Sequence, residues 1–389
     1  MSGAVGGAVG GFLRRVGAMM RKEFLQLLRD RVSFATMISI PLLQLVLFGY
    51  AINTTPRHLP TAVLAYEDTS LSRSILAAIE NTKYFAVVSH PGSAAEADHQ
   101  MLAGEVSFIV EIPAGFERAV RRGESPSMLV AADATDPVAS GSAVAALRAL
   151  VETAVKRERF AVEGGPEGSG LESAPPAFQI ITHARYNPAA VTQLNIVPGL
   201  LGTILTMTML IFTALSVTRE IERGTMETLL AMPIRPVEVM LGKIAPYVLV
   251  GAGQALMIVG AGLYLFRVPM IGSPGLLTLL TVLFIVANLS IGYTFSTLAQ
   301  NQLQAVQMTF MYFLPNILLS GFMFPFAGMP LWAQYLAETM PLTHYLRMVR
   351  GIMLKGAEVS DLSRDIVALG AIMLVAMFIA VRRFRQTLD

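Results

Sequence analysis

Long apolar runs alternate with polar segments along this chain of 389 residues. Each run is almost free of formal charge and close to the roughly 20 residues that a helix needs to cross a bilayer. The pattern predicts six membrane-spanning helices, at Ser33–Asn53, Leu194–Val217, Ile244–Phe266, Leu276–Ala299, Ala305–Ala327 and Ile366–Val381. Prolines inside these runs do not exclude helices, because neighbouring helices can satisfy the carbonyls that a proline frees.

Between the first two runs the residue pattern changes to that of a globular domain, in which short β-rich runs alternate with helix-like stretches. This alternation predicts a small α/β layer with mixed strands. The expected strands are Ala62–Tyr66, Tyr84–Val88, Ser107–Ile112, Ser127–Ala132 and Phe178–Arg185. The expected helices are Ser70–Asn81, Ser93–Ala103, Gly115–Gly123 and Ser140–Phe160, and Ala161–Pro176 reads as a linker. The predicted fold class is an α-helical integral membrane protein with an inserted α/β domain outside the cytoplasm.

Composition agrees with a membrane protein, since 54% of the residues are hydrophobic and 14% are charged, against about 25% charged in soluble chains. A net charge of +2 without a continuous basic patch argues against nucleic-acid binding. The absence of cysteine excludes disulfides and thiolate metal sites.

Lys and Arg near the span ends indicate the orientation, because such residues are retained in the cytoplasm while long domains translocate regardless of charge. They gather before the first span, after the second and after the last, which places both termini in the cytoplasm. The Gly-rich N-terminus is not typical of a cleaved signal peptide. A basic segment between Pro330 and Arg364 does not fit an ordinary span, so we expect a re-entrant or interfacial helix there, with Trp332, Tyr335 and Tyr345 at the interface.

Two cytoplasmic elements stand out. Phe12–Arg29 predicts an amphipathic helix lying on the membrane surface, and a positive-inside anchor without any further role is an equal alternative. The loop after the second span is longer than two membrane helices need; Gly224 would end the second span, and Thr225–Met232 would form a short helix that stops at Pro233. A small amphipathic helix away from the bilayer can dock into a groove of a partner.

Polar residues in the insert have structural as well as functional interpretations. Asp68 fits a helix-capping or turn acid better than a ligand. Asp133 and Asp136 could form a metal pair, but a turn before the long helix explains them better. His90 and His99 lack any metal-ligand spacing, so we expect both to be solvated.

Inside the spans the polar residues are neutral. They could line a pathway for an amphipathic substrate, although interhelical hydrogen bonds are the simpler explanation for any one of them. The candidates for pathway lining are Gln44, Asn195, Gln254, Asn288 and Asn316. The glycines of the third span are interpreted as close-packing positions: Gly251, Gly253, Gly260 and Gly262.

One loop motif carries a resemblance to a known family. The segment EIERGTMETLLAMP, from Glu220 to Pro233, resembles the signature of the membrane subunits of type 2 ATP-binding-cassette (ABC) exporters. The likeness extends to RKEFLQLLRDR, YEDTS, IPAGFERAVRRG, AADATDP and MPLTHYLRMVRGIMLKG, and so covers most of the chain. Within that family it resembles bacterial drug or lipid exporter permeases that have six spans and a large periplasmic domain.

The resemblance implies a domain organisation and a location in the bacterial inner membrane. It implies a cytoplasmic helix in residues 1–31, the first span in 32–54, a periplasmic domain in 55–192, and five spans in 193–389. The last part would include a cytoplasmic coupling loop at 218–243 and an outer re-entrant segment at 328–357.

The resemblance also implies that transport and ATP hydrolysis belong to different subunits. This chain would be a non-catalytic permease without a cofactor of its own, driven by a partner ABC ATPase that binds ATP and Mg²⁺. The lack of a GxxxxGK[ST] phosphate loop agrees with that. A second permease, identical or homologous, and a periplasmic adaptor are further implied partners. The implied ATPase-coupling residues are Glu220, Glu222, Gly224, Thr225, Glu227, Leu229, Leu230 and Pro233.

The main alternative is a membrane-anchored receptor or scaffold whose insert binds a ligand outside. Six spans are more than anchoring requires. An ion-coupled transporter is disfavoured because such proteins carry ionisable groups at membrane depth. An intramembrane enzyme is disfavoured because no His, Asp or Ser cluster with catalytic spacing occurs in the spans.

Overall fold

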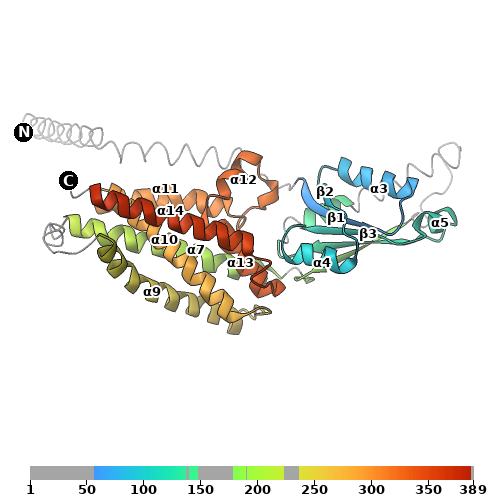
Figure 1. Cartoon of the computed structure of the whole chain (residues 1–389). Coiled ribbons are helices and arrows are strands. Elements are labelled where there is room, and N and C mark those ends of the chain that lie inside the picture. Colours follow the sequence, from blue (N-terminus) through green and yellow to red (C-terminus); the bar gives the residue numbers. More distant parts are fainter. Residues whose placement is uncertain (1–56, 137–139, 148–177, 190, 223–235, 387–389) are drawn as a thin grey trace, which may run out of the picture.

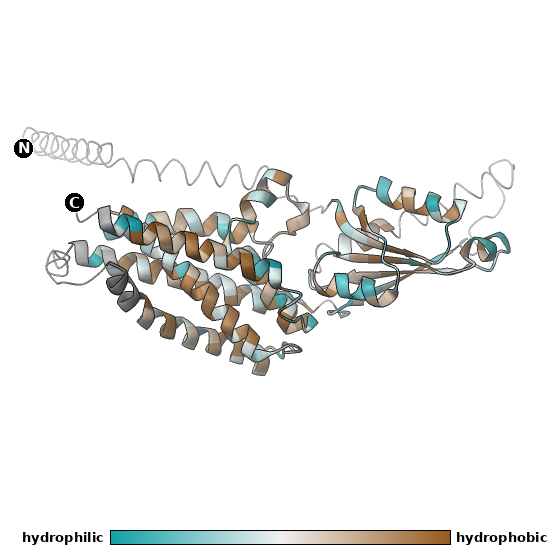
Figure 2. Ribbon diagram, in the orientation of Figure 1, coloured by the Kyte–Doolittle hydropathy of each residue, from teal (hydrophilic) through white to brown (hydrophobic). Residues whose placement is uncertain are grey.

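A computed structural model describes residues 57–386 except 137–139, 148–177, 190 and 223–235. It contains a helical bundle and, beyond one end of the bundle, a separate domain built on a β-sheet (Figure 1). The helices of the bundle consist mainly of hydrophobic residues, whereas the insert is hydrophobic mainly in its sheet and more hydrophilic in its helices (Figure 2). This contrast is what a lipid-facing part and a water-facing part of one chain require.

The insert contains a mixed five-stranded sheet of order β2-β1-β3-β4-β5. All of its neighbouring strands are parallel except β3 and β4, which are antiparallel. The strands are β1 (Leu59–Ala65), β2 (Phe85–Ser89), β3 (Phe108–Ile112), β4 (Ser127–Asp133) and β5 (Gln179–Arg185). The expected α/β layer is confirmed, with some strand ends shifted by a few residues.

Strand residues alternate between two apolar cores, because successive side chains point to opposite faces of a sheet. Phe108 and Val110 of β3 pack in one core with helix α3 (Ser70–Asn81), while Ile109 packs in the other with α4 (Ala94–Leu102). The two helices therefore cover opposite faces (Figure 1). Helix α5 is Phe116–Arg121, and the expected helix Ser140–Phe160 is described only over residues 140–147, where it is helical.

The bundle contains α7 (Thr192–Glu222), α9 (Pro236–Tyr264), α10 (Pro274–Leu298), α11 (Gln302–Leu319) and α14 (Ser363–Gln386). Within the part of the chain that the structure describes, four helices are long and apolar enough to cross a membrane, namely α7, α9, α10 and α14. The expected span Ser33–Asn53 and the expected helix Phe12–Arg29 lie outside the described residues. The number of six spans therefore stays a prediction.

The expected fifth span, Ala305–Ala327, is wrong at its C-terminal end. Helix α11 stops at Leu319, and Gly321 adopts a left-handed backbone with φ of 83°. Glycine reaches this conformation without the steric cost that a Cβ imposes. The chain therefore turns before the hydrophobic run itself ends, and hydrophobicity alone could not locate that turn.

The outer segment forms two short helices, α12 (Leu331–Ala337) and α13 (Pro341–Arg350), followed by a π-helical turn, η4 (Gly351–Lys355). Trp332 and Tyr335 are exposed, and their interfacial position stays a prediction. The expectation for Tyr345 is wrong, because its ring is fully buried and stacks on Phe284 of α10 with centroids 3.9 Å apart. Helix α13 therefore packs against the bundle.

Only part of the glycine prediction is confirmed. A Cβ at Gly251 would lie 2.9 Å from Met209 Sδ, and one at Gly262 would lie 3.0 Å from Val197 Cγ1, so both glycines permit close packing against α7. A Cβ at Gly253 or at Gly260 would meet no neighbouring element of the described residues within 4 Å, so close packing is not observed at these two glycines. Helix periodicity places the four glycines on different faces of α9, and only one face meets α7.

Candidate functional site

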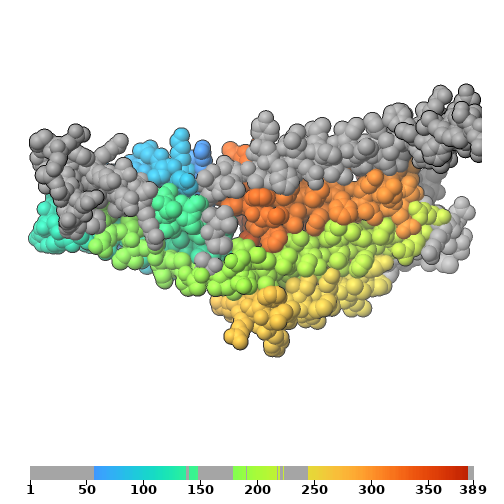
Figure 3. All heavy atoms as spheres, turned by 180° about the vertical axis from the view of Figure 1, so that it is seen from behind, coloured from blue at the N-terminus to red at the C-terminus, as the bar shows by residue number. Residues whose placement is uncertain are grey.

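Helix α7 links the two parts of the chain that carry the candidate functional residues. It runs without interruption for 31 residues, from the end of the insert to the start of the coupling loop. Seen from behind, the chain from β5 through α7 forms one continuous green band from the insert to the far end of the bundle (Figure 3). Of the implied coupling residues, Glu220 and Glu222 lie in its last turn. The others lie outside the described residues: Gly224, Thr225, Glu227, Leu229, Leu230 and Pro233.

Glu222 has a structural partner at this end of the bundle. Its carboxylate accepts hydrogen bonds from the backbone N–H of Gln302, at 2.7 Å, and from the Gln302 side-chain amide. Gln302 is the first residue of α11, whose N-terminal N–H groups have no partner within the helix. These hydrogen bonds hold the pKa of Glu222 below its ordinary value. The last turn of α7 is thereby tied to the start of α11.

Two of the candidate pathway residues make contacts between elements. Gln254 of α9 accepts a hydrogen bond from the Thr208 hydroxyl of α7 at 2.8 Å. Asn195 lies in the first turn of α7, at the end of the bundle next to the insert, and donates to the Thr135 carbonyl of the insert at 2.8 Å. The simpler interpretation, that such residues hold elements together, accounts for both contacts.

The other candidates are Asn288, Asn316 and Gln44, and Gln44 lies outside the described residues. Asn288 of α10 and Asn316 of α11 are fully buried. Asn288 donates to the Phe284 carbonyl one turn earlier, but its Oδ1 and both amide atoms of Asn316 have no hydrogen-bond partner among the described residues. Buried polar atoms without partners are uncommon and costly. These two amides remain candidates for contact with a substrate.

The outer segment is fixed to the last span by a buried network of charges. His344 of α13 contacts Asp365 of α14 through Nδ1 at 2.7 Å and the Glu338 carbonyl through Nε2 at 2.9 Å. Arg347 bridges the carboxylates of the same two acids, at 2.6 Å to Glu338 and 3.4 Å to Asp365. Burial alone would lower the pKa of His344, but the hydrogen bonds and negative charges of both acids raise it above the ordinary value.

Asp133, one of the two possible metal ligands in the insert, forms an ion pair instead. Its Oδ2 lies 2.5 Å from Lys355 Nζ at the end of η4, and its Oδ1 accepts from the backbone and hydroxyl of Thr135. The carbonyl of Asp136 accepts from Ser140, so both acids occupy the expected turn. Among the described residues no group of three or more His, Cys, Asp and Glu side chains could hold a metal ion.

His99 is exposed as expected, but its Nε2 also lies 3.4 Å from Asp361, in the connection between η4 and α14. His90 is exposed as well. The AADATDP segment of the insert and the late MPLTHYLRMVRGIMLKG segment, which share the resemblance, come together in space through the Asp133–Lys355 pair.

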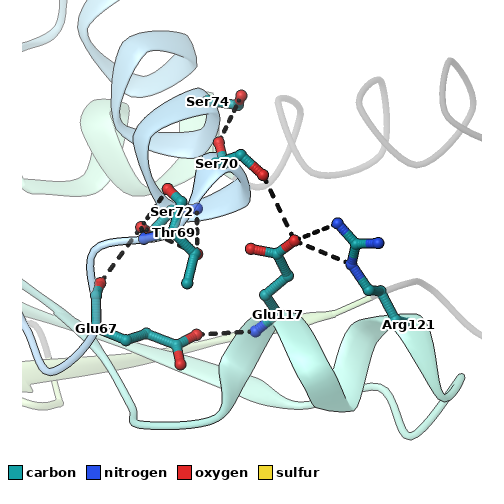
Figure 4. A network of polar contacts seen from close by, with 7 residues as sticks. All are labelled: Glu67, Thr69, Ser70, Ser72, Ser74, Glu117 and Arg121. Atoms are coloured by element: carbon teal, nitrogen blue, oxygen red, sulfur yellow. Dashed lines mark hydrogen bonds and ion pairs between the residues drawn. The ribbon is translucent and has the colours of Figure 1, made fainter.

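Two other segments of that resemblance, YEDTS and IPAGFERAVRRG, also meet (Figure 4). The Glu67 carboxylate accepts from the backbone N–H groups of Gly115 and Glu117, at 2.8 and 2.9 Å, and so caps the N-terminus of α5. Glu117 in turn binds Arg121 and Ser70. The cap of α3 is Thr69, not Asp68, which forms an exposed ion pair with Arg73. The capping prediction for Asp68 was wrong because Thr69 starts the helix.

Sequence reasoning missed Lys355, Arg350, His344 and Glu67. Each of these residues contacts a partner that is distant in sequence, and no local spacing indicates such a pair. The basic residues inside the mostly apolar outer segment were the one available sign that partners exist, because a charge that lies among apolar residues needs a partner.

Comparison with known proteins agrees with this architecture. The family model described as "ABC-2 family transporter protein" matches residues 31–382. The chain is 30% identical to the probable multidrug ABC transporter permease YbhS of Escherichia coli (strain K12), over 88% of this chain and 89% of YbhS. It is 28% identical to the probable multidrug ABC transporter permease YbhR of that strain, over 91% of this chain and 92% of YbhR.

A third relative from the same strain is the inner membrane transport permease YhhJ, which is 29% identical over 97% of this chain and 98% of its own length. Because the family model covers nearly the whole chain, the match includes the bundle, the insert and the loop between α7 and α9. The chain belongs to the ABC-2 transporter family, as a multi-pass inner-membrane permease subunit of an exporter whose ATP is hydrolysed by a partner subunit.

Proposed function

We propose that this permease moves an amphipathic substrate, drug-like or lipid-like, out of the cytoplasm or the inner leaflet. The observation that carries the proposal is the pair of buried amides of Asn288 and Asn316, whose unpaired atoms lie in a part of the bundle without formal charge. Such a lining offers hydrogen bonds to an uncharged polar group and apolar contacts to the rest of a molecule. Two relatives, YbhS and YbhR, are named as probable multidrug permeases.

Transport into inverted membrane vesicles tests this proposal. Vesicles that contain the permease and its ATPase are given ATP and a panel of amphipathic dyes, drugs and fluorescent lipids. We expect ATP-dependent accumulation of uncharged or cationic amphipathic compounds and none of small hydrophilic ions. Accumulation of hydrophilic solutes alone would overturn the proposed substrate class.

The orientation is part of the same proposal, with both termini in the cytoplasm and the insert in the periplasm. The two ends of α7 support it, since Thr192 follows the insert and Glu222 precedes the proposed docking loop. These two ends of α7 lie at opposite ends of the bundle (Figure 1). The described end of α14, with Arg382 and Arg383, lies at the same end as the loop, in keeping with the retention of basic residues in the cytoplasm.

The ATPase docks on the segment from Glu220 to Pro233, with the N-terminal helix as a second contact, and a second permease, identical or homologous, completes the exporter. A periplasmic adaptor is a further candidate partner of the insert. Helix α9 starts at Pro236, which leaves a short segment between two long helices for this docking. A receptor or scaffold role is disfavoured by the family match over residues 31–382.

Co-purification tests the docking segment. We expect Glu227→Arg with Leu230→Asp to release the ATPase from detergent-solubilised permease, because the pair places a reversed charge and a buried carboxylate in the contact. The matched control makes the same kinds of change outside the segment, Glu358→Arg with Val359→Asp, where both side chains are exposed. Retention of the ATPase by the first pair would show that docking lies elsewhere.

A further inference from the structure

The insert is tied to the bundle by side chains as well as by the chain itself. We call the residues of this contact the outer junction: Asp133 and Thr135 of the insert, Asn195 of α7, Arg350 of α13 and Lys355 of η4. Lys355 and Asn195 contact the insert directly, at the last residue of β4 and in the turn that follows it, and Arg350 is joined to them through Asn195.

The ion pair at the centre of the outer junction is largely buried. The side chains of Lys355 and Asp133 are 8% and 13% exposed. Lys355 also donates to the Met101 carbonyl at 3.2 Å, and its ammonium lies 5.3 Å from the ring centroid of Tyr186. Asp133 is held by Thr135 on its other oxygen. A buried ion pair that is hydrogen-bonded on both sides is costly to separate, because each charge would lose its partner away from water.

A second chain of hydrogen bonds joins the same turn to α7 and α11. The Thr135 carbonyl accepts from Asn195 of α7 at 2.8 Å, and the Asn195 side-chain oxygen accepts from Arg350 at 3.0 Å. Arg350 also donates to the Gly321 carbonyl, in the turn after α11, at 3.2 Å. The outer ends of α7, α11 and α13 are thereby held together.

The π-helical turn fixes the position of Lys355. The carbonyls of Ile352 and Met353 accept from the backbone N–H groups of Gly272 and Ile271, in the connection between α9 and α10. A Cβ at Gly272 would lie 2.7 Å from the Ile352 carbonyl oxygen, so only glycine allows this approach. Single π-turns within helices are often found at functional sites. The turn in this chain directs a lysine out of the bundle and into the insert.

Helix α7 connects the outer junction to the opposite side of the membrane. Its 31 residues correspond to a rod about 46 Å long at roughly 1.5 Å per residue. Its far end is bound to α11 through Glu222 and Gln302 and continues into the loop on which we propose that the ATPase docks. Helices α7 and α11 are therefore tied at both ends.

We infer that the outer junction is a rigid joint, so that the insert moves as one body with the outer segment and α7 during transport. The positioning residues for export are Lys355, Asp133 and Asn195, because their contacts transmit the movement of α7 to the insert. The inference rests on the proposed docking of the ATPase at the loop after α7.

Distance measurements between two spin labels test the rigidity directly. The chain has no cysteine, so His90→Cys in the insert and Tyr335→Cys on α12, both exposed, give two unique labelling sites. We expect one narrow distance distribution that is the same without nucleotide and with trapped ATP. A shift between the two states larger than the width of the distribution would overturn the inference. The measurement needs no substrate, so a wrong substrate class cannot affect it.

The variant Lys355→Met removes the charge and keeps an unbranched side chain that is one atom shorter. We expect it to broaden the label distance and to lower the substrate exported per ATP hydrolysed about tenfold, a typical size for coupling between distant sites. ATPase binding and ATP hydrolysis should stay near the wild-type level, which distinguishes this outcome from failure of the docking proposal. Equal export per ATP in Lys355→Met and wild type would contradict the inference.

Two control variants separate coupling from general damage. Lys355→Arg keeps the charge and should preserve both the narrow distance and the export ratio. Arg73→Met makes the same charge change in an exposed ion pair of the insert, whose side chains are 65% and 79% exposed, and should alter neither. A loss of export in Arg73→Met equal to that in Lys355→Met would show that the outer junction has no special role in export.

Discussion

His344 is held between two acids of different elements, Asp365 at the start of α14 and Glu338 after α12, and its side chain is 2% exposed. Arg347 balances one of the two negative charges, and its guanidinium also lies over the Phe326 ring at 4.5 Å. With His344 protonated, the network contains two positive and two negative charges. Loss of that proton leaves a buried excess of negative charge, which a low-dielectric site disfavours.

The stability of the protein should therefore depend on pH through His344. Its pKa is raised above the ordinary value of 6.5, so its contribution to stability is complete below that ordinary value and is lost as pH rises through the raised pKa. We expect the Tm of the purified permease to fall across that pH range and the fall to be smaller in His344→Gln. Thermal unfolding in detergent at a series of pH values measures this. His90→Gln, at an exposed site, should keep the wild-type slope, and an unchanged slope in His344→Gln would assign the pH dependence to other groups.

Substitution of Asn316 should change the stability of the protein and its transport activity in opposite directions. Both atoms of its amide are buried without a partner in the part of the chain that the structure describes, and such a group costs about 1–3 kcal/mol. We expect Asn316→Leu, which is similar in size, to raise the Tm while lowering ATP-dependent transport of the amphipathic substrate. Thermal unfolding and vesicle transport of the same preparation measure both. A rise in Tm with full transport would mean that Asn316 does not contact the substrate.

Some contacts of single residues follow from the local sequence, and others do not. The turn expected around Asp133 and Asp136 is present, because Asp favours turns through its own local hydrogen bonds. The burial of Tyr345 was not predictable, because its hydroxyl finds a partner in Thr281 of α10, 64 positions away in sequence. The same holds for Glu67, whose partners on α5 lie 48 and 50 positions ahead.

Among the elements, α7 and α10 pack closely in the centre of the bundle because a glycine permits it. A Cβ at Gly292 of α10 would lie 2.9 Å from the Leu210 carbonyl oxygen and 3.1 Å from Thr213 Cβ of α7. The backbone of α7 cannot move aside as a flexible side chain could. Gly292 was not singled out from the sequence, since a lone glycine in an apolar run does not show which helix lies opposite it.

Gly292→Ala should therefore separate α7 from α10 and destabilise the bundle by about 1–3 kcal/mol, as overpacking does. Gly253→Ala is the matched control, because a Cβ there meets no neighbouring element within 4 Å. In a helix interior that exchange should be neutral or stabilising by up to about 1 kcal/mol. Thermal unfolding in detergent compares the two variants. Equal Tm values would show that the helices can adjust to the added methyl group.

At the scale of the whole molecule, the insert and the coupling loop lie at opposite ends of one helix. Removing residues 57–190 while keeping the spans should abolish export, because α7 would have nothing to move outside the membrane. ATPase binding should survive, since the loop after α7 is unchanged. Vesicle transport and co-purification measure the two properties. Full export by the shortened chain would show that the insert is dispensable for transport.

The chain by itself determined which segments are apolar enough to enter the membrane, which form the sheet, and to which family the protein belongs. Long apolar runs and period-two strands are local patterns, and burial in lipid or beneath a sheet requires them wherever the segment ends up. The same patterns identified four bundle helices and all five strands before any contact was known.

Only the tertiary structure decided where polar groups meet. Lys355 and Asp133 are 222 positions apart, and Arg350 and Asn195 are 155 apart. A charge near the end of an apolar segment requires a partner but does not specify one, because the partner is selected by the packing of whole elements. The insert is therefore visible in the sequence as a domain, whereas its attachment to α7 and the outer segment through these side chains is visible only in three dimensions.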